Sequence, residues 1–209
     1  MCRWELIMSR SPAVISMSDS GGPIGPEDIA PTVLPDAFLT SDIAQAARTF
    51  RLPRYAELPA MPLYRDQVAT YVEQLFAPLA TCSDGPWITA SMVNNYVKHG
   101  LIPAPVKKQY GRPQLARLIV ICIFKQFLPM AAIERLFSIQ RMTYPEATAF
   151  DYVAVELEGA LRAAFSQGRQ LDDTAHRVTR ESLLVRSAVG AFAAKAYLMS
   201  YLRFSGLED

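Results

Sequence analysis

Apolar residues recur at spacings of three and four along most of the chain, which is the pattern of helices with one buried face. A first stripe consists of Val68, Tyr71, Val72 and Leu75. Further apolar runs predict a long helix from near Arg112 to about Phe127 and a short one over 130–137. The one candidate for extended structure is a two-stranded wing at 106–110. The pattern therefore predicts an all-α fold.

The short segment 89–99 is predicted to be a helix with two contrasting faces. Thr89 or Ser91 can cap its first turn. Gly100 can adopt the left-handed conformation that ends a helix, with Leu101 as the apolar contact. The inward face consists of Val93, Tyr96 and Val97, and the outward face of Ser91, Asn94, Asn95 and Lys98. One face is therefore uniformly rich in hydrogen-bonding groups.

Two longer helices are predicted beyond Ser138. The first begins at a possible capping box of Thr143 and Glu146 and ends near Gly168. The second spans about 179–204 and carries Val185, Val189, Phe192, Ala196 and Met199 at alternating spacings of four and three. This heptad spacing is typical of helix–helix contacts, either in a core or between two copies of the chain.

Linker residues suggest how the chain is divided. The stretch SDSGGPIGP at 18–26 has no apolar period, so residues 1–35 are predicted to be a flexible tail. We interpret 36–140 as one domain and 141–209 as a helical C-terminal region. A hydrophobic content of 51% and a charged content of 20% are ordinary for a folded protein and exclude wholesale disorder.

Charge is distributed unevenly along the chain. The formal net charge is only +1, yet no Asp or Glu lies between Asp84 and Glu134. The basic residues of this segment are Lys98, Lys107, Lys108, Arg112, Arg117 and Lys125. An ordinary solvated face mixes both signs, so the segment predicts an anionic partner.

The sequence contains no pattern typical of a catalytic or metal site. Cys2, Cys82 and Cys122 are odd in number and widely spaced, which argues against zinc binding and against a disulfide framework. The two histidines are far apart, and we find no nucleophile motif or phosphate-binding loop. We therefore predict a protein that is not an enzyme, with no cofactor and no evident small-molecule ligand. Charged residues interrupt the apolar runs, so we predict no membrane segment and a cytoplasmic location.

The polar face of the 89–99 helix is chemically suited to the major groove of double-stranded DNA. Asn pairs with adenine, Lys donates to guanine, and Ser is adaptable. The following wing, 105–112, is predicted to hold phosphates through Lys107, Lys108, Tyr110 and Arg112. About four to six such contacts would give a log–log salt slope of roughly −4 to −5. The open alternative is a non-catalytic helical module that binds an acidic protein partner.

The order of motifs in this segment resembles MerR-type regulators. The matching stretches are MVNNYVKHGLI at 92–102, KQY at 108–110, LARL at 115–118 and FLPMAAI at 127–133. The resemblance implies a winged helix-turn-helix in which Asn94 occupies a DNA-contacting position, Lys108 replaces the wing Arg and Tyr110 reaches a phosphate. Departures from the pattern are a shortened wing and a longer loop, 77–86, between the two helices.

The chain more closely resembles a bacterial family of domains of unknown function, number 1836. LPRYAELP at 52–59, NNYVK at 94–98 and VKK at 106–108 carry this likeness, which covers roughly 52–187 and implies a fold more than an activity. Together these observations predict a DNA-binding transcriptional regulator with a MerR-like winged helix-turn-helix and additional C-terminal helices. Because helix-turn-helix proteins commonly read two half-sites, we expect a homodimer formed through the last helix.

Overall fold

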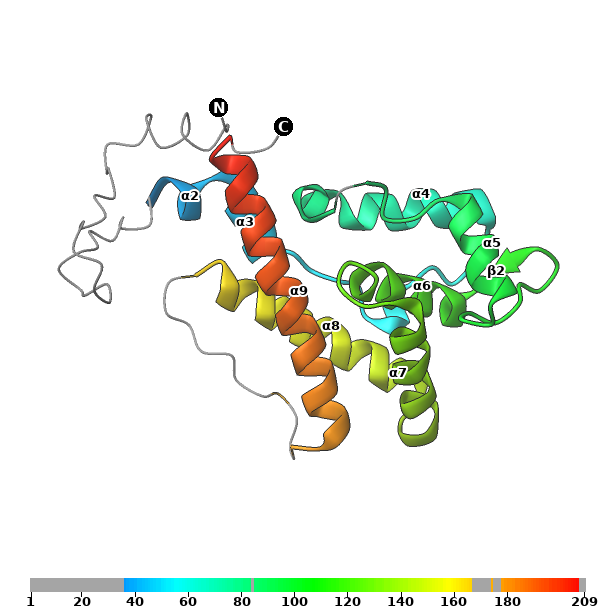
Figure 1. Cartoon of the computed structure of the whole chain (residues 1–209). Coiled ribbons are helices and arrows are strands. Elements are labelled where there is room, and N and C mark those ends of the chain that lie inside the picture. The colour runs from blue at the N-terminus through cyan, green and yellow to red at the C-terminus, as the bar shows by residue number, and fades with distance from the viewer. Residues whose placement is uncertain (1–35, 84, 167–173, 175–177, 207–209) are drawn as a thin grey trace, which may run out of the picture. The chain divides into compact units, whose positions relative to one another are not determined.

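Most of the chain is helical (Figure 1). The computed structural model describes residues 36–83, 85–166, 174 and 178–206, and the predicted tail over 1–35 lies outside them. The helical elements are α2 (Asp36–Thr40), α3 (Asp42–Arg48), the 3-10 turn η2 (Tyr55–Glu57), α4 (Arg65–Phe76), the 3-10 segment η3 (Ala77–Cys82), α5 (Ala90–Lys98), α6 (Arg112–Phe124), α7 (Met130–Thr143), α8 (Glu146–Ala164) and α9 (Arg180–Phe204). The strands of this described part, β1 (Leu63–Tyr64) and β2 (Gln109–Tyr110), form one antiparallel pair. The all-α prediction is confirmed.

The boundary between α7 and α8 differs from the predicted one. α7 continues to Thr143, whose hydroxyl donates to the Ile139 carbonyl at 3.0 Å within that helix. Tyr144 is extended because the residue before a proline is disfavoured in helical conformation, and Pro145 then precedes the first turn of α8. The predicted capping box of Thr143 and Glu146 is therefore wrong. α8 ends at Ala164, with Phe165 as its C-cap, before the predicted end near Gly168, which itself lies outside the described residues.

The core is built around α6. Every residue of this helix from Gln114 to Phe124 is buried, with the exception of Arg117. α6 contacts both α8 and α9, which form the most extensive contact between any two elements. α3 contacts both helices of this pair, and η3 contacts α9. A helix buried on almost all sides needs apolar residues all round, which explains the uninterrupted run LIVICIF at 118–124.

The heptad stripe of α9 faces the interior of its own chain. Val189, Phe192 and Ala196 have no exposed surface, and the Phe192 ring lies 6.2 Å from that of Trp87. These side chains are therefore part of the core of the chain, and the expected homodimer stays a prediction. By length and composition α9 is the one helix of the described residues that could cross a membrane, a test that core helices also pass.

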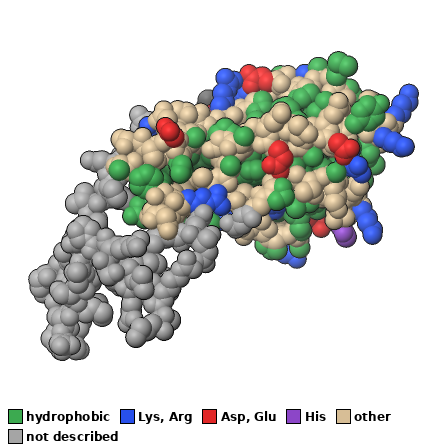
Figure 2. Space-filling view, turned by 90° about the horizontal axis from the view of Figure 1, so that it is seen from above, with side chains coloured by type: hydrophobic (Ala, Val, Ile, Leu, Met, Phe, Trp, Pro, Cys, Tyr) green, Lys and Arg blue, Asp and Glu red, His purple; other side chains and the backbone are tan. Residues whose placement is uncertain are grey.

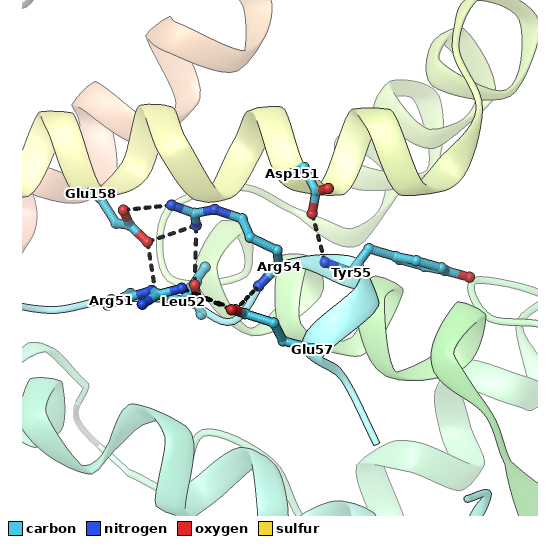
Figure 3. Close-up of polar contacts among 7 residues, drawn as sticks. All are labelled: Arg51, Leu52, Arg54, Tyr55, Glu57, Asp151 and Glu158. Atoms are coloured by element: carbon cyan, nitrogen blue, oxygen red, sulfur yellow. Dashed lines mark hydrogen bonds and ion pairs between the residues drawn. The ribbon is translucent and has the colours of Figure 1, made fainter. Parts of the chain in front are cut away.

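Polar contacts fix the extended segment before η2 to α8 (Figure 3). The Arg54 guanidinium donates to both carboxylate oxygens of Glu158, at 2.8 and 2.9 Å, and the same carboxylate accepts the Leu52 N–H at 3.0 Å. The Tyr55 N–H donates to Asp151 at 2.6 Å. The carboxylate of Glu158 is buried. The Arg54 guanidinium balances its negative charge, and the Leu52 amide adds a further hydrogen bond. The motif LPRYAELP therefore attaches the segment between α3 and α4 to α8.

The residues from Phe38 onward form one compact unit. Within it α3 contacts both α8 and α9, so elements from before and after residue 140 share a core. The boundary predicted between 140 and 141 falls inside α7.

Candidate nucleic-acid interface

The first turn of α5 is held by side chains on both sides of its start. The Thr89 hydroxyl accepts the Met92 N–H at 3.2 Å, which satisfies one of the donors left unpaired at a helix N-terminus. The carboxylate of Glu73 on α4 accepts the Ile88 N–H at 2.8 Å. Trp87 stacks on Phe76 with ring centroids 4.4 Å apart, so the connection from η3 is also packed. The position of α5 is therefore fixed relative to α4.

The last turn of α5 ends in the predicted glycine motif. The Gly100 N–H donates to the Val97 carbonyl at 3.0 Å, and the Leu101 N–H donates to the Tyr96 carbonyl at 2.9 Å. Gly100 has φ +70°, where a residue with a Cβ would be strained. Leu101 is buried, which completes the Schellman arrangement. The chain thus reverses tightly into the loop that carries the basic residues.

The two faces of α5 lie as the sequence predicts. Val93 and Tyr96 are buried and Val97 is half-buried. The outward face, which we call the α5 polar face, consists of Ser91, Asn94, Asn95 and Lys98, all exposed. Burial raises the pKa of Tyr96 to about 12, so its phenol is neutral at physiological pH. The helix therefore presents four hydrogen-bonding side chains over an apolar base.

A tight hairpin follows α5. Val106 and Gln109 exchange two backbone hydrogen bonds, at 3.0 and 2.9 Å, around the two-residue tip Lys107–Lys108. The tip residues have φ +50° and +67°, as in a type I′ turn. Beyond the tip, β2 pairs with β1, with Tyr64 opposite Gln109. The stretch 106–110 thus forms a tight turn closed by one isolated bridge, and the strand that pairs with β2 comes from before α4.

The hairpin tip is conformationally unfavourable for lysine. Positive φ at both central positions favours Asn-Gly, and a side chain in this region costs on the order of 1 kcal/mol or more. Both Lys107 and Lys108 are nonetheless exposed at the end of the turn. Strained residues tend to gather at functional sites, so the charges themselves are a candidate reason for this choice.

Two residues predicted to hold phosphates are used inside the chain instead. Tyr110 is only 4% exposed, because its pairing with Leu63 turns the ring toward the core. Arg112 is half-buried, and its guanidinium donates to the carbonyls of Leu58 at 2.9 Å and Ala56 at 3.0 Å. Both residues therefore fasten the hairpin and α6 to the segment around η2. Their phosphate-binding role stays a prediction that these internal contacts do not support.

Other basic residues of the acid-free segment also have internal contacts. Arg117 pairs with Glu146 at 2.7 Å, and the Lys125 ammonium lies 3.7 Å from the Met92 sulfur beneath α5. The exposed cations that remain from the segment are Lys98, Lys107 and Lys108. The structure thus concentrates the available charge at the hairpin tip and the end of α5.

The strand pairing brings in two residues that sequence reasoning missed. Tyr64 is 56% exposed beside Gln109, and Arg65 follows it at the start of α4. Because Tyr64 pairs with Gln109, Arg65 stands one residue beyond the end of the strand pair. Burial raises the pKa of Tyr110, and the charge of Arg65 opposes this rise. Arg65 also contacts Asp66 at 3.1 Å. No local pattern predicts this pairing, because β1 and β2 are far apart in the chain and only two residues long.

Charged side chains gather at the end of the molecule formed by α5 and the hairpin. Figure 1 shows α5 and the hairpin at β2 next to each other. Figure 2 shows Lys and Arg side chains projecting from the same end, with acidic side chains close by. The described residues include no cluster of His, Cys, Asp or Glu able to hold a metal. The exposed side chains of the α5 polar face and of the hairpin tip are hydrogen-bonding groups and lysine ammonium groups.

Part of the chain matches a known protein family. Residues 53–153 match the family described as Domain of unknown function (DUF1836). No curated protein and no solved structure matches the chain. The DUF1836 segment begins at Pro53, next to the Arg54 anchor, and contains β1, α4, α5, the hairpin, α6 and α7. It therefore includes the whole candidate interface, whereas Glu158, the carboxylate that holds Arg54, lies beyond it.

Proposed function

We propose that this protein is a DNA-binding transcriptional regulator with a MerR-like winged helix-turn-helix. In this interpretation α4 and α5 are its two helices, α5 is the recognition helix and the 106–109 hairpin is the wing. The order β1, α4, α5, hairpin, α6 and the pairing of β1 with β2 support it. η3 replaces the short turn between the helices, and it packs against α9 rather than projecting toward a ligand.

The α5 polar face supplies groups that can distinguish bases. Asn94 and Asn95 each carry a donor and an acceptor, which is the pattern that pairs with the major-groove edge of adenine. Lys98 can donate to guanine. Since α5 is fixed at both ends, these side chains would meet the groove without ordering the helix first.

The hairpin supplies the contacts to the DNA backbone. Lys107 and Lys108 at the tip, with Arg65 next to the β1–β2 pair, would give about three phosphate contacts and a log–log salt slope near −3. This slope is shallower than the one expected from the sequence, because Tyr110 and Arg112 are engaged internally. The observation that carries the proposal is the pair of lysines in a strained turn beside an exposed Asn/Lys face.

The proposal is tested by the affinity of the full chain for a labelled random-sequence duplex over a salt series. We expect Lys107→Glu/Lys108→Glu to lower that affinity by about tenfold or more at low salt and to flatten the salt slope. The matched control is Arg135→Glu/Arg162→Glu, which makes the same charge change at exposed positions on α7 and α8. The control should retain binding.

Two results would contradict DNA binding at this surface. One is no retention of DNA by the wild-type chain at low salt, and the other is an equal loss in both double variants. Polyglutamate bound as tightly as duplex DNA would favour the alternative, a module that recognises an acidic protein partner.

A further inference from the structure

A cavity of about 520 Å³ lies between α6, α7, α8 and the first turns of α9. Its walls include Val120, Leu136, Phe137, Phe150, Val153 and Val185. Tyr144, at the junction of α7 and α8, is 43% exposed and marks its mouth. The sequence gives no indication of this space, because each wall residue would equally suit a filled core.

Residual exposure shows that the cavity reaches into the core. Val120, Phe137 and Val153 each remain 7% exposed, whereas Ile119, Ile121 and Leu157 on the same helices α6 and α8 have no exposed surface. Val120, Phe137 and Val153, the three residues that keep some exposed surface, all line the cavity. Because protein interiors pack at nearly crystalline density, a space of this size is not an ordinary packing defect.

The wall is mostly apolar. Its charged residues are Arg117 and Glu146, which pair with each other, and Glu181, which pairs with Arg180 at 2.6 Å. Arg117 on α6 donates through Nε to Glu146 on α8 at 2.7 Å, and its guanidinium lies 5.5 Å from the centre of the Phe137 ring. The side chains of this pair are 12% and 26% exposed. Each charge is already balanced by the other, so an ionic ligand would have no unpaired counter-charge in this pair. A guanidinium bonded through Nε still has N–H groups that can donate to a carbonyl oxygen.

We infer that the cavity binds an uncharged, largely hydrocarbon small molecule with an aromatic ring and a carbonyl group. The volume lies within the range of small-molecule sites, and a mostly apolar lining with a few placed polar groups is their usual composition. The carbonyl would accept from Arg117, and the rings of Phe137 and Phe150 would contact the aromatic part. Residues of four helices line this space, and it opens to solvent beside Tyr144.

The test uses two uncharged fluorescent naphthalene dyes with the full chain. Prodan carries a ketone, and phenylnaphthylamine lacks a carbonyl. We expect saturable binding of both, with Prodan bound more tightly. Ala149→Phe and Leu136→Trp, which add bulk to the wall, should each lower affinity by about tenfold or more while the thermal midpoint is kept. The matched control is Ala191→Phe on the exposed side of α9, which should bind as the wild type does.

The polar anchor is tested separately. Arg117→Met/Glu146→Gln removes both charges together and should weaken Prodan more than phenylnaphthylamine. Binding that does not saturate, or that survives both filling variants, would overturn the site. So would a wild-type chain that binds neither dye and sediments as a dimer until Tyr144→Asp makes it monomeric, because a second copy would then occupy the cavity.

Discussion

The helices α5 and α9 both carry a stripe that the sequence assigns to a partner, and the structure treats them in opposite ways. The polar stripe of α5 is exposed, whereas the apolar stripe of α9 is covered by the chain itself. A polar side chain has no reason to be buried without a hydrogen-bond partner, so its outward placement follows from its chemistry. An apolar stripe requires only that something covers it, and periodicity does not say what.

The largest effect that tests this contrast is expected at Phe192. Phe192→Asp would place a carboxylate where the native ring is fully buried, and we expect a loss of about 4 kcal/mol or more in the free energy of unfolding. Urea denaturation followed by circular dichroism measures it. The control is Leu198→Asp on the same helix, where the side chain is 60% exposed and a change within about 0.5 kcal/mol is expected.

A folded Phe192→Asp chain would contradict the core assignment. If that variant kept its secondary structure and sedimented at half the wild-type mass, the stripe would belong to an interface between two copies. The aromatic contact of Phe192 with Trp87 argues for the core, because it links α9 to the segment that leads into α5.

How much of this fold is predictable depends on the range of the interactions. The capped start of α5, its glycine end and its two faces follow from nearest neighbours in the sequence, and each was predicted. The docking of Arg54 onto Glu158 was not, because a buried ion pair between distant residues leaves no local signal. The internal contacts of Tyr110 and Arg112 were not predicted for the same reason: β1 and the η2 segment, which engage them, are both distant in sequence.

The inward face of α5 gives a second, smaller effect through pH. The pKa of Tyr96 is about 12 in the folded chain against an ordinary 10, so the unfolded chain loses the proton first. The contribution of Tyr96 to stability should therefore fall as pH rises from 10 toward 12, by about 1 kcal/mol at pH 11. Urea midpoints at pH 9 and 11 measure the fall. Tyr96→Phe should reduce it, and Tyr64→Phe at the exposed strand should leave it unchanged.

Cys122 contributes to the same alkaline range and has to be separated. Burial raises the pKa of the Cys122 thiol to about 12. The unfolded chain loses this proton at lower pH than the folded chain does, so this group also lowers the stability as the pH rises toward 12. Cys122→Ala combined with Tyr96→Phe should remove more of the pH dependence than either change alone. A Tyr96→Phe profile identical to that of the wild type would mean that the phenol reaches solvent.

The hairpin should respond with opposite signs in stability and binding. Lys107→Asn/Lys108→Gly places the residues that a type I′ turn favours at φ +50° and +67°, and we expect a gain of about 1 kcal/mol in unfolding free energy. The same change removes two cations, so the DNA salt slope should fall from about −3 to about −1. Thermal denaturation and duplex titration of one preparation measure both. A gain in stability with unchanged DNA affinity would mean that the lysines do not contact phosphate.

The smallest effect on stability is expected at Asn94, on the exposed face of α5. Asn94→Ala removes no intrachain contact that fixes the helix, so the unfolding free energy should change by less than about 0.5 kcal/mol. Affinity for a duplex selected from genomic fragments should nevertheless fall by about 1–3 kcal/mol, while affinity for random DNA stays constant, since base contacts specify and phosphate contacts position. Ser187→Ala on α9 is the matched polar control. Equal losses of affinity for both DNAs would make Asn94 an ordinary surface residue. The exposure of the α5 polar face would then say as little about a binding partner as the apolar stripe of α9 does.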